Sequence, residues 1–134
     1  MIDNTQFYIN GEWVDPVVAN PFEVINPATE KAVGLISMGS SADVDKAVAA
    51  AVAAFPSWSV SSIEERITIM KKFIELYEAR AEEMAQLMML EMGSPIRFSR
   101  NDQTPTGPGL FQSTIEAMEA HDFERPSMRG GSLL

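Results

Sequence analysis

The 134-residue sequence contains no cysteine and a single histidine. Without cysteine there is no disulfide, no thiolate metal site and no cysteine nucleophile. The histidine, His121, has no Gly-x-Ser-x-Gly motif to pair with, so the sequence does not indicate serine–histidine catalysis. His121 lies near the end of a predicted helix, where we interpret it as a surface residue that complements the helix dipole.

Long apolar runs and basic residues are also scarce. No run approaches the roughly 18 apolar residues of a membrane-spanning helix. The opening MIDNTQFY has an acid and no basic residue before any apolar run, unlike a secretory signal. Ten basic residues against 19 acidic ones give a net charge of −9, which argues against nucleic acid or an anionic membrane as a partner. We therefore expect a cytoplasmic location.

The 46% apolar content is typical of a folded chain and fits one domain. The segment FYINGEWV (7–14) predicts a hairpin, because Asn10 and Gly11 suit the positive φ angles of a type I′ turn. A two-residue turn would place Tyr8 opposite Trp13, an aromatic cross-strand pair.

A second antiparallel pair of strands is predicted at 22–25 and 32–37. Asn26-Pro27 suits the turn between them, because proline pre-sets φ and asparagine can accept a hydrogen bond from the backbone two residues on. Gly34, inside the second strand of this pair, indicates a close backbone approach or a bulge.

The first helix is predicted to begin after Ser40, with Asp43 as the acid of a weak capping box, and to stop at Pro56. Its apolar residues recur at helical spacing and form one stripe: Val44, Ala47, Val48, Ala51, Val52 and Phe55. Small residues on the opposite face suggest a helix wedged between two layers.

A second helical stretch is predicted to begin at Ser61 or Ser62, each followed by a glutamate three residues later. Its main stripe is Ile63, Ile67, Met70, Ile74 and Tyr77, and its flank is Ile69, Phe73 and Leu76. The wide apolar sector predicts cover on more than one side. A break is expected within 79–82, after which Ala81, Met84, Ala85, Met88 and Met92 face inward. Gly93 is a natural helix end, and Pro95 follows it.

The remainder is predicted to contain a polar connection at 95–106 and a last helix opened by Pro108. The inner stripe of that helix would be Phe111, Ile115 and Met118. Residues 127–134 have the character of the beginning of a strand.

Few side chains indicate chemistry. The glycine-containing turns at 39–41 and 107–109 lack the spacing of a dinucleotide or phosphate fingerprint. The adjacent acids Glu64/Glu65 and Glu82/Glu83 diverge by about 100° on a helix, so neither pair converges on a substrate. Glu91 is different, because a carboxylate at that helix end could meet strand carbonyls and bind a hard cation.

Four segments in order resemble one enzyme family: YINGEWV, FEVINPATEKAVG, ADVDKAVAAAVAAFPSWS and ERITIMKKFIELYEARAEEMAQLMMLEMGSP. Together they are similar to the N-terminal segment of NAD(P)-dependent aldehyde dehydrogenases. The resemblance implies that residues 1–126 are part of a cofactor-binding domain. It also implies that residues 127–134 begin a truncated strand of the oligomerisation arm.

The resemblance implies a chemistry as well. In the family a cysteine thiolate attacks an aldehyde, hydride passes to NAD or NADP, and a glutamate-activated water releases the carboxylic acid. The family's catalytic and cofactor-binding residues belong to later segments, so no such residue is assigned here and no cofactor is expected to bind this chain alone. Some members hold a structural sodium or potassium ion at positions that match Val24, Ile25 and Glu91, where Glu replaces the more usual Asp.

The sequence thus predicts an α/β fold of two β-hairpins followed by about four amphipathic helices, without the parallel cofactor-binding sheet. The predicted function is that of an inactive N-terminal fragment of an oxidoreductase, whose parent acts on an aldehyde as a homo-oligomer. The alternative is a non-catalytic interaction module that docks on intact dehydrogenase subunits through uncovered apolar faces.

Overall fold

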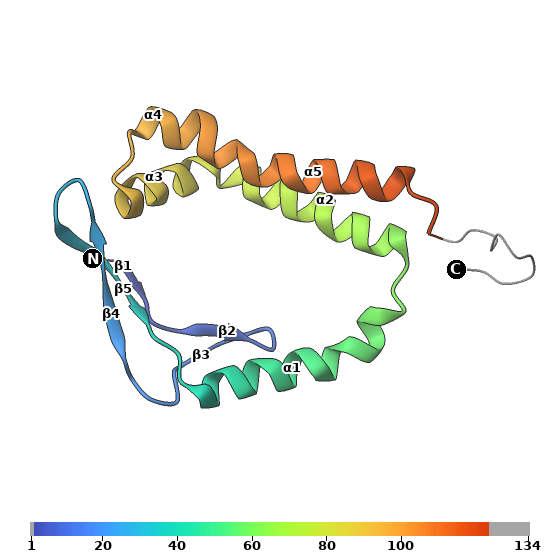
Figure 1. Ribbon diagram of the computed structural model, residues 1–134, viewed down its shortest axis with the longest axis horizontal. Helices are drawn as coiled ribbons and strands as arrows, with labels where there is room; N and C mark the ends of the chain where they lie inside the picture. The colour runs from blue at the N-terminus through green and yellow to red at the C-terminus, as the bar shows by residue number, and fades with distance from the viewer. Residues whose placement is uncertain (1, 124–134) are drawn as a thin grey trace, which may run out of the picture.

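The computed structural model of the chain describes residues 2–123 (Figure 1). Five short strands come first: β1 (Ile2–Asn4), β2 (Phe7–Ile9), β3 (Glu12–Val14), β4 (Pro21–Asn26) and β5 (Lys31–Ser37). The helical elements follow: α1 (Ser41–Ser59), α2 (Ile63–Ala79), α3 (Ala81–Met92), α4 (Ile96–Phe98), the π-helical turn η1 (Ser99–Gln103) and α5 (Thr104–Ala120). The predicted order of small sheets followed by helices is confirmed.

The β2–β3 hairpin has the predicted register. Tyr8 lies opposite Trp13, and their ring centroids are 5.2 Å apart. Asn10 and Gly11 have φ angles of 55° and 84°, the signs that a type I′ turn requires. The local turn chemistry is therefore sufficient to determine this element.

The β4–β5 pair is antiparallel, as predicted, with a bulge between Val24 and Ile25. The sequence did not predict β1, which pairs with β5 in parallel. This three-residue strand has no alternation to reveal it, and only its tertiary pairing makes it a strand. Gly34 lies at that pairing, where a Cβ would be 3.3 Å from the Ile2 carbonyl oxygen. The expectation of a close approach at Gly34 is confirmed.

Helix α1 begins where predicted but ends later. The Asp43 carboxylate accepts hydrogen bonds from the Ser40 amide (2.8 Å) and the Ser40 hydroxyl (2.7 Å). The prediction that Pro56 stops the helix is wrong, because the helix continues to Ser59. A proline near the end of a helix removes a single backbone hydrogen bond. In the same turn of the helix, the Ala54 carbonyl accepts a hydrogen bond from the Ser57 hydroxyl at 3.1 Å.

The expectation that α1 is wedged between layers is not met within this chain. Every residue from 51 to 60 is exposed, and the stripe residues Val48 and Phe55 are 54% and 65% exposed. The helix packs against the hairpin only near its N-terminal end, where Asp43 is buried. The stripe therefore has no partner among the described residues.

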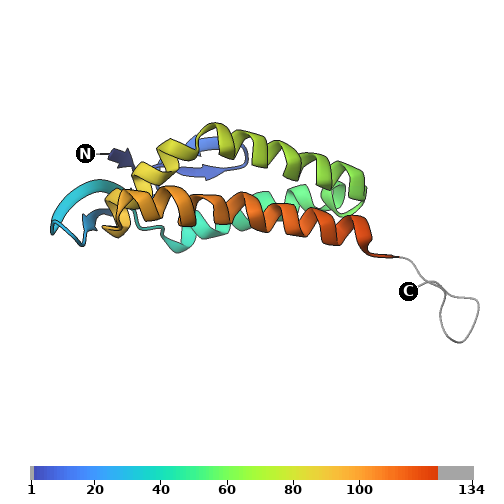
Figure 2. The same ribbon diagram turned by 90° about the horizontal axis from the view of Figure 1, so that it is seen from above.

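Helices α2, α3 and α5 form the other side of the structure, with α2 and α5 side by side (Figure 2). The main stripe of α2 faces α5, a pairing that the sequence did not predict, and Ile67 and Ile115 are buried there. The Phe73 and Phe111 rings pack with centroids 4.4 Å apart. The flank of α2 and Met92 of α3 are exposed instead of covered.

The break between α2 and α3 falls at Arg80, inside the predicted window. The prediction of a polar connection at 95–106 is wrong, since α4, η1 and the start of α5 make it helical. Pro108 lies inside α5 and does not open it. The missing signal is tertiary: Ser99 and Thr104 are buried, and the Thr104 hydroxyl donates to the Ser99 carbonyl at 2.8 Å.

The predicted strand at 127–134 lies outside the described residues. Of the helices in residues 2–123, none is long and apolar enough to cross a membrane.

The ribbon follows an open ring, with α1 on one side and α2, α3 and α5 on the other (Figure 1). The accessible surface is 10091 Å², whereas a compact monomer of this mass exposes about 6900 Å². Among the described residues, the buried apolar ones are Ile67, Ala85 and Ile115. The apolar faces of α2 and α5 meet, but the α1 stripe has no apolar partner among the described residues, so the core is small.

Gly93 joins the helical side of the ring to the sheet. It ends α3 in the left-handed conformation (φ 65°, ψ 17°), as predicted for a helix end. A Cβ at Gly93 would lie 2.9 Å from the Ala28 amide nitrogen and 3.0 Å from Pro27 Cγ. Only glycine combines this φ angle with so close an approach to the β4–β5 turn.

We predict that Gly93→Ala lowers the free energy of unfolding by about 1–3 kcal/mol, because it adds a strained φ angle and a clash with Ala28. The matched control is Gly109→Ala in α5, where a Cβ would meet nothing within 4 Å. The control variant should gain about 0.5–1 kcal/mol, because alanine favours the helix interior. Urea unfolding followed by circular dichroism measures both changes, and equal effects in the two variants would contradict the role given to Gly93.

Candidate functional site

The structure brings two of the three predicted cation-site residues together. Val24 and Glu91 line one cavity of about 20 Å³ between the three-stranded sheet and the end of α3, which is room for about one water molecule or ion. Ile25 is not among the lining residues, although it follows Val24 directly. The cavity therefore includes Val24 of β4 and Glu91 of α3, but not the third predicted residue.

Local structure explains this placement. The Asn26 side-chain oxygen accepts hydrogen bonds from the amides of Ala28 (2.8 Å) and Thr29 (3.3 Å), which fixes the predicted turn. Gly93 rests on that turn, so the last residues of α3 reach the end of β4. The bulge after Val24 takes backbone groups out of the regular ladder at this point.

The predicted ligands are those of a weakly held monovalent cation. Strand carbonyls and one carboxylate are hard oxygen donors. Within the described part of the chain, no three acidic or histidine side chains gather closely enough to hold a metal ion. Glu91 is exposed and would supply the single negative charge, so the residues present are better matched to a singly charged ion than to a divalent one.

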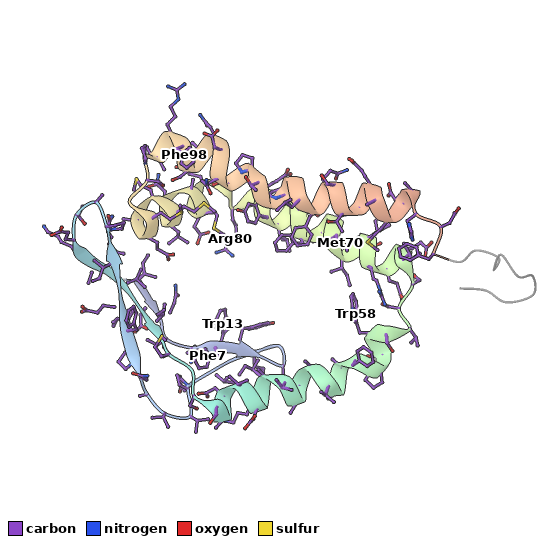
Figure 3. All side chains as sticks on the ribbon, in the orientation of Figure 1. Phe7, Trp13, Trp58, Met70, Arg80 and Phe98 are labelled. Atoms are coloured by element: carbon purple, nitrogen blue, oxygen red, sulfur yellow. The ribbon has the colours of Figure 1, made fainter. Side chains whose placement is uncertain are left out.

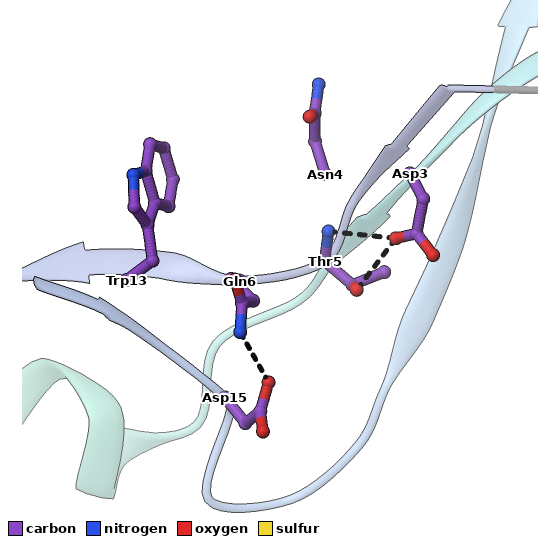
Figure 4. A pocket seen from close by; sticks show the side chains of 6 residues that line it. All are labelled: Asp3, Asn4, Thr5, Gln6, Trp13 and Asp15. Carbon is purple, nitrogen blue, oxygen red and sulfur yellow. Dashed lines mark hydrogen bonds between the residues drawn. The ribbon is translucent and has the colours of Figure 1, made fainter.

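A polar hollow of about 530 Å³ lies beside the hairpin (Figure 4). Its two acids have partners: Asp3 accepts hydrogen bonds from the amide and hydroxyl of Thr5 (3.3 and 2.8 Å), and Asp15 accepts one from the Gln6 amide group at 3.0 Å. The first interaction lies within residues 3–5, and the second joins the two ends of the hairpin, at Gln6 before β2 and Asp15 after β3. The Thr5 hydroxyl bound to Asp3 belongs to an exposed local turn between residues two apart, an arrangement typical of turn structure and not of catalysis.

The helical acids do not converge, as predicted. Glu65 accepts a hydrogen bond from the Ser62 amide at 2.8 Å, which settles the start of α2 in favour of Ser62. Glu82 forms two hydrogen bonds to Arg100, at 2.7 and 2.6 Å. Hydrogen bonding to this guanidinium lowers the pKa of Glu82 to about 2. Glu83 pairs with Arg80 instead. These pairs are exposed and connect helices.

Asp43 is the one acid that is buried among the described residues, at 5% exposure. Hydrogen bonds from the Ser40 hydroxyl and from the amides of Val17 (2.8 Å) and Ser40 lower its pKa. The bond to Val17 ties the connector after the hairpin to the start of α1, a contact that sequence reasoning missed because 26 residues separate the partners. All the hydrogen bonds to this carboxylate come from structural elements, so its role is structural.

The only histidine has no catalytic setting. His121 is exposed directly after α5, as expected. Its ring packs edge-on against Phe123, with centroids 4.8 Å apart. Within residues 2–123, no serine–histidine–acid arrangement involves it.

The fold is α/β, with small sheets followed by helices. A family model described as "Aldehyde dehydrogenase family" matches residues 13–132, and the chain belongs to this family. It is 42% identical to a 3-succinoylsemialdehyde-pyridine dehydrogenase from Pseudomonas sp over 92% of its own length and 26% of the relative. It is 37% identical to a putative aldehyde dehydrogenase of Staphylococcus aureus over its whole length and 28% of that protein.

Solved structures agree. An aldehyde dehydrogenase from Bartonella henselae superposes with a TM-score of 0.94 at 39% identity, over 98% of this chain and 28% of that one. A mutant aldehyde dehydrogenase C from Pseudomonas syringae, in complex with NAD⁺ and octanal, gives a TM-score of 0.88 at 39% identity, over 92% of this chain and 25% of that one. The chain therefore spans about a quarter of the length of the relatives it matches, and it corresponds to their N-terminal portion.

We predict that Asp43→Asn lowers the free energy of unfolding at neutral pH. The difference in this free energy between the variant and the wild type should become smaller in acid. Because the folded-state pKa is lowered, the stabilisation is complete above the ordinary aspartate pKa of about 3.9 and is lost as the pH falls through the folded-state value. Urea unfolding from neutral pH to about pH 3 measures the change. Asp45→Asn, on an exposed residue of the same helix, is the control. A difference that stays constant with pH would contradict the prediction.

Proposed function

We propose that this chain is a portion of an NAD(P)-dependent aldehyde dehydrogenase that oxidises an aldehyde to a carboxylic acid. The observation that carries the proposal is the match of almost the whole chain to family members, one of which was solved with NAD⁺ and octanal. In this proposal residues 1–126 form an outer part of the cofactor-binding domain, and the sheet that holds the cofactor lies elsewhere in the protein.

By itself the chain is proposed to be inactive. The family chemistry needs a thiolate, and the sequence has no cysteine. The one hydroxyl–carboxylate contact in the hollow beside the hairpin, Thr5 to Asp3, is an exposed local turn. The hydrogen bonds made by Asp43 and Glu82 go to backbone and side-chain groups that connect elements, so these acids act in folding and not in catalysis.

We propose that residues outside this segment determine which aldehyde the whole enzyme accepts. Relatives named for 3-succinoylsemialdehyde-pyridine and solved with octanal match it at 42% and 39% identity. A segment shared at this level by proteins linked to such different aldehydes supports a common scaffold role. NAD or NADP would serve the whole enzyme as the hydride acceptor.

The remaining expectations stay proposals for the whole protein. A homo-oligomer is supported only by the family assignment. A cytoplasmic location, with no nucleic acid or membrane as a partner, is supported by the lack of cysteine and the net charge of −9.

A structural sodium or potassium ion is also proposed, at the cavity lined by Val24 and Glu91, with the Ile25 carbonyl as the third expected ligand. When bound, the ion would supply positive charge that links the end of β4 to the end of α3. Its role would be in stability and not in the reaction.

The chain alone should give no aldehyde-dependent reduction of NAD or NADP, because it cannot form the thiohemiacetal from which hydride leaves. Absorbance of the reduced nicotinamide, measured with several aldehydes, tests this expectation. A relative such as the Bartonella henselae enzyme is the positive control for the assay. Turnover by the chain alone would overturn the proposed inactivity.

Sodium or potassium should stabilise the chain more than choline at equal ionic strength. At a cation concentration of about 100 times the dissociation constant, the gain is about 2.7 kcal/mol. Glu91→Gln should abolish the difference between salts, whereas Glu78→Gln, on an exposed residue of α2, should retain it. Thermal unfolding in the matched salts measures the effect, and a cation response that survives in Glu91→Gln would exclude this site.

A further inference from the structure

Two apolar surfaces of this chain have no covering partner among residues 2–123. The first, the α1 stripe, is exposed at Val44, Val48, Val52 and Phe55. The second, the α2 flank, is exposed at Ile69, Phe73 and Leu76. Soluble monomers seldom expose apolar patches of this extent unless the patches bind something.

The α2 flank continues into a groove. Phe73 and Leu76 line an apolar hollow of about 470 Å³ that runs on to Met84 and Leu87 of α3. The Arg80 side chain lies at the same hollow and projects into the interior of the ring, whereas Trp13 projects into that interior from the hairpin (Figure 3). Apolar groups with a charged rim are typical of an interaction surface.

The two surfaces cannot cover each other, because the corner between α1 and α2 is fixed. The Arg66 guanidinium lies over the Trp58 ring, 5.2 Å from its centroid. It also donates to the Ser61 hydroxyl (2.9 Å) and to the Trp58 carbonyl (3.1 Å). These contacts hold the turn and keep the two helices apart.

The similarity to much longer proteins indicates what kind of partner these surfaces fit. The Bartonella henselae enzyme has the same open arrangement over 98% of this chain, which accounts for 28% of that enzyme. Inside a complete enzyme, helices that diverge in this way leave a space between them, and the rest of that enzyme's chain fills it. The ring is therefore shaped around a body larger than itself.

We propose that the α1 stripe and the α2 flank bind the portion of an aldehyde dehydrogenase outside the segment that matches residues 1–134, and that this contact forms even when that portion is supplied as a separate chain. This inference rests on the proposed function and adds a partner. An intact dehydrogenase subunit is not the partner, because its own N-terminal segment already occupies these contacts. A second copy of this chain is a poorer partner, because each copy carries a net charge of −9 and like charges repel.

Two forms of the Bartonella henselae enzyme test the proposal. In the hybrid form, residues 1–134 of this chain replace the matching segment. In the split form, the full chain is co-expressed with the remainder of that enzyme, so that the remainder need not fold alone. We expect a soluble hybrid and co-purification of the split pair, whereas the intact Bartonella henselae enzyme should not bind the chain.

A matched pair of variants locates the contact. Val48→Asp places a carboxylate in the α1 stripe, and Ala53→Asp places one on the opposite side of the same helix, about 140° away. We expect Val48→Asp to lower recovery of the split pair by about tenfold or more, since an unpaired buried charge is costly. Ala53→Asp should leave recovery within about twofold of the unmodified pair. Circular dichroism of both variants controls for the helix itself.

The outcomes separate this inference from the proposed function. The inference is overturned if the hybrid is soluble but the split form does not co-purify, or if the hybrid is insoluble. It is also overturned if the chain binds the intact enzyme, if it assembles only with a second copy of itself, or if the two substitutions have equal effects. Co-purification with aldehyde-dependent NAD reduction supports both proposals. Co-purification without reduction, when the hybrid is also inactive, supports the docking and contradicts the proposed function.

Discussion

The contact between the end of α3 and the β4–β5 turn is the constraint on which the arrangement of the chain depends. Gly93 rests on Pro27 and Ala28 with no room for a side chain. This contact joins the helices to the three-stranded sheet and closes one side of the ring. The small cavity lined by Val24 and Glu91 exists because these two elements meet there. A single left-handed glycine therefore serves both the fold and the candidate cation site.

The opposite side of the ring depends on the corner between α1 and α2. Arg66 lies over Trp58 and holds the turn through the Ser61 hydroxyl. Beyond the Asp43–Val17 hydrogen bond at its N-terminal end, α1 has no layer beneath it among the described residues, and Val48 and Phe55 stay exposed. A chain with two fixed corners and little core of its own has the form of a scaffold around another body. That form agrees with its place in the aldehyde dehydrogenase family, whose members it spans over about a quarter of their length.

Elements governed by neighbouring residues could be predicted from the sequence. The hairpin turn, the Asn26 turn, the break at Arg80 and the end of α3 at Gly93 all follow from φ preferences or from hydrogen bonds within a few residues. The errors have a common cause. Segment 95–106 looked irregular because its helix depends on the burial of Ser99 and Thr104, and β1 is a strand only through its pairing with β5.

The candidate site was anticipated as a combination of Val24, Ile25 and Glu91, but only two of these line the same cavity. By itself the sequence determined the family, the local elements and the absence of a thiol, because each of these is carried by residue identities and short spacings. Only the tertiary structure decided which apolar faces are covered and that α1 and α2 lie apart. It also decided that Asp43 accepts a hydrogen bond from the Val17 amide. Those features depend on contacts between distant segments, and their energies are set by geometry that no short stretch of sequence contains.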